Sequence, residues 1–148
     1  MDFRAYLLLL ILASGCEKHE YTDSGMNSLK QCEGEMTNLQ LFIEENVAAV
    51  VLAEPDENHK LHNCVDVNVI DELNVYKQKF SDCLFLEMVE KGTVEAQNSP
   101  YRWIDSQVLF LTTSLESCNK VDDPKLVKLL LKDAKEKYFN ILDIFSNQ

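Results

Sequence analysis

Apolar side chains recur every three or four residues along four stretches of the chain, which is the spacing of an amphipathic helix. The stretches are Leu29 to Ala53, Cys64 to Gly92, Pro100 to Cys118 and Pro124 to Phe145. In the first stretch the repeat predicts that Val47 and Val50 are both buried. Four helices, each with one apolar face to bury, predict an all-α four-helix bundle.

The second stretch is the central one, because a cysteine lies near each end of it. Its apolar residues form one expected stripe: Val69, Leu73, Tyr76, Phe80, Leu84 and Met88. A helix would hold Cys64 and Cys83 about 25 Å or more apart. Because a disulfide needs Cα atoms within roughly 7 Å, each cysteine must reach a different neighbouring helix.

The helix boundaries are marked by capping residues and by glycine. We expect Asp23 or Ser24 to cap the first helix and Gly92 to end the second in a left-handed conformation. The other helices are expected to begin at side chains that accept hydrogen bonds from the first turn: Asp66 or Asn68, Ser99 and Asp123.

The N-terminal residues have the layout of a secretory signal. Residues 5–13 form an apolar run after Arg4, and small residues follow it. The run is too short to span a membrane, so residues 1–16 are predicted to be a cleaved signal and 17–148 a single secreted domain. The alternatives are a bacterial lipoprotein acylated at Cys16 and a buried N-terminal helix.

Removing Cys16 from the five cysteines leaves an even set in an oxidising compartment, which predicts two disulfides with three pairings to consider. If the helices run up, down, up, down, Cys32 and Cys83 lie at matching heights within roughly 5 Å, and Cys64 meets Cys118. The alternative, up, up, down, down, needs a long crossover where only residues 119–124 are available. We favour the first topology, with the pairs Cys32–Cys83 and Cys64–Cys118.

Charge and motifs argue against several classes of function. The formal net charge of −11 repels phosphate backbones and anionic lipids, so nucleic acid and membrane surfaces are not expected partners. No catalytic signature is present, and we expect neither enzymatic activity nor a cofactor. We interpret His59 and His62, near Cys64, as solvated loop residues beside a disulfide and not as a metal site.

Two oppositely charged helix faces remain as candidate binding surfaces. The fourth helix carries a basic strip of Lys125, Lys128, Lys132 and Lys135, and the first helix carries Glu33, Glu44 and Glu45. These charges are either solvated faces or a protein-binding face that steers encounter with a charged partner. A rival function is transport of a small apolar ligand held near residues 47–52 and Trp103, although we expect Trp103 to anchor the core.

The leader, the four helices, the cysteine before the second helix and the amphipathic final segment SCNKVDDPKLVKLLLKDAKEKYFNILDIF together resemble short-chain four-helix cytokines of the common-gamma-chain interleukin group. The short link at 119–124 and Cys83 depart from that family. The resemblance implies a secreted ligand of a cell-surface receptor. It also implies that exposed residues of the first and last helices face the receptor: Glu44, Glu45, Lys128, Lys132 and Lys135.

Overall fold

The computed structural model describes residues 26–52 and 64–147, and all of its regular structure in these two ranges is helical. The elements are α2 (Leu29–Phe42), the π-helical turn η1 (Ile43–Val47), α3 (Ala48–Leu52), α4 (Val67–Lys91), the 3-10 turn η2 (Glu95–Asn98), α5 (Pro100–Asn119) and α6 (Pro124–Ser146). Because α2, η1 and α3 follow one another without a break, they act as the first of four packed helices.

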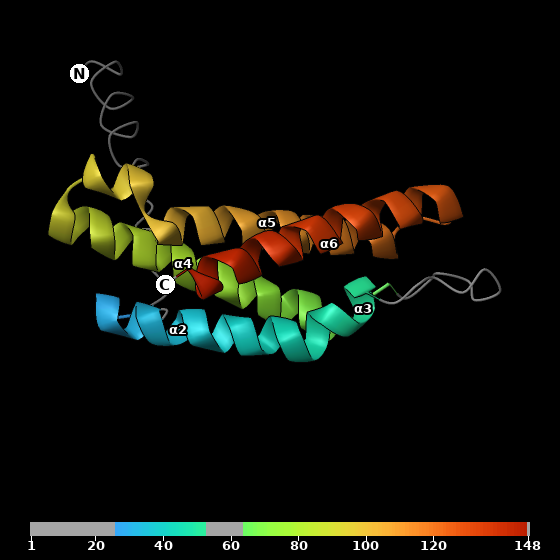
Figure 1. The fold of residues 1–148 in the computed structure, drawn as a ribbon, viewed down its shortest axis with the longest axis horizontal. Helices are drawn as coiled ribbons and strands as arrows, with labels where there is room; N and C mark the ends of the chain where they lie inside the picture. The colour runs from blue at the N-terminus through green and yellow to red at the C-terminus, as the bar shows by residue number, and fades with distance from the viewer. Residues whose placement is uncertain (1–25, 53–63, 148) are drawn as a thin grey trace, which may run out of the picture.

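The four helices run up, down, up, down, as the short links predict. In Figure 1, α2 and α3 run from left to right, α4 returns, α5 runs to the right again, and α6 returns to the left. The helix α5 packs against α4 and α6, and α2 also packs against α4 and α6. Each helix therefore has two neighbours in a closed ring, and the crossover topology is ruled out.

Two disulfides hold this ring together, with the predicted pairing. Cys32 of α2 is bonded to Cys83 of α4, and Cys64 is bonded to Cys118 of α5. In each pair the Cα atoms are 5.8 Å apart. The first bond lies toward the end of the bundle where α4 finishes, and the second lies at the opposite end, where α4 begins.

The core consists mainly of the apolar stripes expected from the periodicity. The largest fully buried side chains are Phe80, Leu39, Ile43, Leu73, Ile104, Leu111, Leu115 and Ile141. A smaller cluster joins the Cys64–Cys118 disulfide to Val127 and Leu131 of α6. The disulfide thus fixes the first turns of α6 against the end of α5.

Three helices begin at the predicted caps. The carboxylate of Asp66 accepts from the backbone N–H of Asn68 at 2.9 Å, and the Ser99 hydroxyl accepts from that of Tyr101 at 3.1 Å. The carboxylate of Asp123 likewise accepts from the backbone N–H of Lys125 at 2.9 Å. Each side chain satisfies an N–H that has no partner within its helix.

The ends of the first two helices differ from the expectation. The first helix is capped at Ser28, whose N–H donates to the side-chain oxygen of Gln31 at 3.0 Å, so the assignment to Asp23 or Ser24 was wrong. Those two residues lie outside the described ranges. Gly92 ends α4 as predicted, with a positive φ of 94°, but its ψ of 159° differs from that of the left-handed helical conformation.

The buried stripes of α2–α3 and α4 also depart from the predicted positions. Val51 is 4% exposed, whereas Val50 is only half-buried, because the wider turn of η1 shifts the stripe by one residue. In α4 the buried positions include Cys83 and Glu87, while Met88 is 37% exposed. The first helix departs from the prediction because η1 interrupts its regular repeat. The helix α4 is regular, but its last buried positions, Cys83 and Glu87, lie one residue before the predicted Leu84 and Met88.

Candidate functional site

The five predicted receptor-facing residues lie on two neighbouring elements of the bundle. Glu44 and Glu45 belong to η1, at the end of α2, and Lys128, Lys132 and Lys135 belong to α6. All five are exposed. Because α2 and α3 both pack against α6, the acidic and basic groups belong to adjacent helices (Figure 1). We call these five residues the α2–α6 charged face.

Glu44 lies close to α6. Its side chain accepts a hydrogen bond from the Gln40 amide at 3.0 Å, which holds it along α2. Burial and, secondarily, the negative charge of Glu44 raise the pKa of the Tyr138 hydroxyl on α6. Glu44 is therefore electrostatically coupled to α6.

The lysines of this face remain available to an external partner. Lys132 lies 3.9 Å from Glu136, but both side chains are mostly exposed, so the pair contributes at most about 1 kcal/mol. Lys135 lies over the Phe139 ring, with Nζ 5.9 Å from the ring centroid. In the part of the chain that the structure describes, no ion pair joins these lysines to Glu44 or Glu45.

Exposed apolar side chains lie on the same helices as the charges, and they were not among the residues predicted from the sequence. Leu41 of α2 is 50% exposed, and Leu129 and Phe139 of α6 are 61% and 46% exposed. The signal available in the sequence was the density of leucines from 126 to 131, which is greater than one buried stripe can hold. A face that mixes charged and exposed apolar groups is typical of protein-binding surfaces.

Trp103 does not anchor the core as predicted, since 38% of it is exposed. It lies in the first turn of α5, whereas residues 47–52 lie where the first helix ends, at the opposite end of the bundle (Figure 1). The two parts of the ligand site considered for a small-molecule carrier are therefore not neighbours. Val47 and Val51 are instead buried in the common core.

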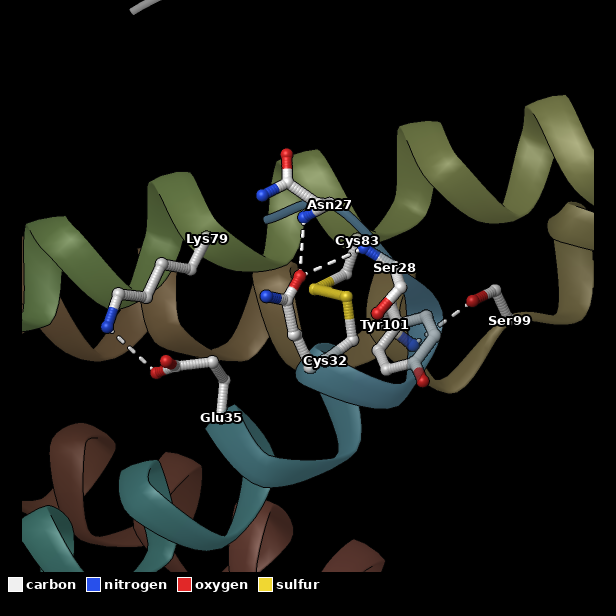
Figure 2. Close-up of a disulfide and its surroundings, with 9 residues drawn as sticks. Asn27, Ser28, Cys32, Glu35, Lys79, Cys83, Ser99 and Tyr101 are labelled. Atoms are coloured by element: carbon white, nitrogen blue, oxygen red, sulfur yellow. Dashed lines mark hydrogen bonds and ion pairs between the residues drawn. A yellow bond between two sulfur atoms is a disulfide. The ribbon is translucent and has the colours of Figure 1, made fainter. Parts of the chain in front are cut away.

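The end of the bundle near the Cys32–Cys83 disulfide is held by an ion pair and an aromatic contact. Figure 2 shows the disulfide with Lys79 and Glu35 beside it, and these two side chains form an ion pair at 2.8 Å. Tyr101 is buried nearby and stacks with Phe80 at a centroid distance of 6.5 Å. These contacts join α2, α4 and α5 into one rigid end.

Several other predictions concern residues outside the described ranges. These include the secretory signal at 1–16, acylation of Cys16, and the histidines His59 and His62. Cys64 is bonded to Cys118, so it does not offer a thiolate to a metal. Within residues 26–52 and 64–147, no three histidine, cysteine or carboxylate side chains group as metal ligands, and no helix is long and apolar enough to cross a membrane.

Comparisons of the chain with protein-family models, curated proteins and solved structures give no match. Its function must therefore be inferred from its own residues. The α2–α6 charged face is the candidate site, because it combines exposed charges of both signs with exposed apolar side chains on packed helices.

Proposed function

We propose that this protein is a secreted, non-enzymatic ligand that binds another protein through the α2–α6 charged face. The observation that carries the proposal is the set of exposed lysines on α6, beside exposed Leu129, on a helix that packs against α2 and α3. The two disulfides are compatible with an extracellular location, where such bonds persist.

The rigidity of the bundle favours binding by a preformed surface. Lys128, Lys132 and Lys135 lie on a 23-residue helix whose buried side packs into the core and against the Cys64–Cys118 disulfide. Side chains mounted on such a helix lose little backbone freedom when a partner binds. Charge on the face would then govern the rate of encounter and the choice of partner.

The partner class that we propose is a cell-surface receptor. The sequence resemblance to short-chain four-helix cytokines favours this choice, because receptor contacts in that family lie on the first and last helices. The up-down-up-down topology of this bundle departs from the crossover topology of that family, so the resemblance extends to the exposed helix faces and not to the connections. A net charge of −11 also disfavours the two main competing surfaces, nucleic acid and anionic membrane. A localised basic strip on an acidic molecule can orient it toward an acidic patch on a receptor.

A cell-binding measurement tests the proposal. Fluorescently labelled protein would be titrated onto intact cells of the organism that encodes it, with and without protease treatment of the cell surface. We expect saturable, protease-sensitive binding that excess unlabelled protein displaces. The variant K128E/K132E/K135E should lose this binding, because it reverses the basic half of the face.

A matched variant separates the role of the face from that of net charge. K30E/K77E/K120E changes the net charge equally but lies on α2, α4 and the end of α5. It should bind cells like the unmodified protein. Equal loss in the two triple variants, or binding that survives removal of cell-surface protein, would overturn the proposal.

A further inference from the structure

The first half of α6 carries a mixed apolar and basic patch that is distinct from the rest of the helix. Five exposed residues that are close together in the sequence make up this patch, which we call the leucine–lysine patch: Lys125, Leu126, Lys128, Leu129 and Lys132. Leu126 is 42% exposed and Leu129 is 61% exposed. Residues three and four apart lie on neighbouring turns of a helix, so these side chains form a nearly continuous surface.

The exposure of the two leucines follows from the register of α6. Val127, Leu131 and Ala134 occupy its buried side, and Val127 and Leu131 pack in the cluster around the Cys64–Cys118 disulfide. Leu129 is two residues from each of those two positions and therefore points away from the disulfide. Because the buried side is filled, Leu126 and Leu129 cannot enter the core without removing other residues from it.

Two of the three lysines of the patch, Lys125 and Lys128, differ in their partners from the lysines farther along α6, whereas Lys132 forms an exposed ion pair with Glu136. Lys137 forms an ion pair with Asp133 at 3.2 Å and lies over the Phe110 ring, and Lys135 lies over the Phe139 ring. By contrast, the side chains of Lys125 and Lys128 make no ion pair or ring contact within residues 26–52 and 64–147. Their charges are open to an incoming ligand.

We infer that the leucine–lysine patch binds an acidic protein segment that carries aliphatic side chains. The inference rests on the proposed protein-binding function and adds the chemistry of the partner. Carboxylates would meet the unpaired lysines, while aliphatic groups would cover Leu126 and Leu129. An anionic membrane could satisfy the same lysines, but the net charge of −11 makes approach to such a surface unfavourable.

An NMR titration tests this inference. Short synthetic peptides would be added to the ¹⁵N-labelled full chain, and binding would be monitored by changes in its amide chemical shifts. One peptide would contain glutamate and leucine, with leucines spaced three and four residues apart. The second would have every glutamate replaced by glutamine. We expect the acidic peptide to shift the amide resonances of residues 125–132 selectively, and we expect the neutral peptide to produce weaker shifts.

Paired variants distinguish a specific patch from general attraction. K128Q/L129S should weaken binding of the acidic peptide about tenfold, since it removes one charge and one apolar contact. K120Q/L109S removes the same groups from the end and outer side of α5 and should leave the affinity unchanged. Absence of selective shifts, or equal weakening by both variants, would overturn the inference.

Vesicles provide the last arm of the test. Binding to mixed phosphatidylcholine–phosphatidylserine vesicles that depends on Lys128 and Leu129, together with no response to the acidic peptide, would assign the patch to membranes and overturn the inference. The experiment is also independent of cell binding. Peptide binding without cell binding would refute the receptor-ligand function while supporting the patch chemistry, whereas the reverse result would refute only the acidic-segment inference.

Discussion

Tyr101 illustrates how burial at one end of the bundle controls the ionisation of a single side chain. Burial has the largest effect on its hydroxyl, and the nearby carboxylates of Glu33 and Glu87 add negative charge. Both effects raise the pKa, although the positive charge of Lys91 opposes them. The folded protein therefore holds the Tyr101 proton more tightly than the unfolded chain does.

This difference predicts a loss of stability at alkaline pH. Below the unfolded tyrosine pKa of about 10 the stabilising contribution is complete, and it is lost as pH rises through the higher folded value. Tyr101→Phe should therefore reduce the decrease in the free energy of unfolding between about pH 9 and 11. Urea denaturation across this range checks the prediction; an unchanged or steeper decrease in the variant would contradict it.

In the same region, the burial of Glu87 and the exposure of Trp103 could not be predicted from the residue types alone. Glu87 is buried because it lies on the core-facing side of α4 and forms an ion pair with Lys91 at 3.0 Å. Trp103 is partly exposed because α5 presents other residues to the core. Hydrophobicity predicts the average burial of a residue type, whereas these two positions are decided by helix register and by partners.

At the scale of the element, η1 explains why the first helix does not follow a regular repeat. Positions 39, 43, 47 and 51 are separated by four residues each, and in a regular α-helix such a series drifts around the helix axis. A π-helical turn contains more residues per turn, so it reduces this drift and keeps Val47 and Val51 buried. The turn therefore determines which residues of α3 contact α6.

Inserting one alanine after Asn46 should reveal this role. Because η1 already absorbs one residue more than a regular helix, a further residue would rotate α3 by about 100° relative to α2 and displace Val51 from the core. We expect the free energy of unfolding to fall by about 2 kcal/mol or more, measured by urea denaturation. Deleting Asn46 is the matched control, because it removes the residue that η1 absorbs and leaves Val51 facing the core; equal stability of the insertion and the deletion would contradict the assigned role.

Three of the four helix starts and most of the buried stripes could be predicted, because they depend on residues that are close together in the sequence. The caps Asp66, Ser99 and Asp123 lie directly beside the helices that they start, and the stripes of α5 and α6 keep a regular spacing. The charged residues of the candidate site were identifiable in the same way. The π-helical turn and the exposure of Leu129 and Phe139 were not, because they depend on how the helices fit together.

At the scale of the whole molecule, the two disulfides close loops of almost the same length. The paired cysteines are 51 and 54 residues apart, so each bond is expected to restrict the unfolded chain to a similar extent. One bond fixes α2 to α4, and the other fixes the start of α4 to the end of α5. Together they connect three of the four helices, and α6 is held by packing.

Removing either disulfide should therefore have a large and similar effect. C32A/C83A and C64A/C118A should each lower the free energy of unfolding by about 3 to 4 kcal/mol, as loop closure predicts. Thermal and urea denaturation of the two variants would check the values. Reduction of the unmodified protein should produce the combined loss; a decrease below about 1 kcal/mol in either variant would contradict this account.

Site-specific photocrosslinking on living cells shows whether the α2–α6 charged face contacts a protein partner. Benzoylphenylalanine would replace Lys132 on this face and, separately, Thr113 on the outer side of α5. We predict one discrete crosslinked cell-surface protein from position 132, competed by excess unlabelled chain, and none from position 113. Crosslinking from position 113 alone, or from neither position under conditions of saturable binding, would contradict the claim.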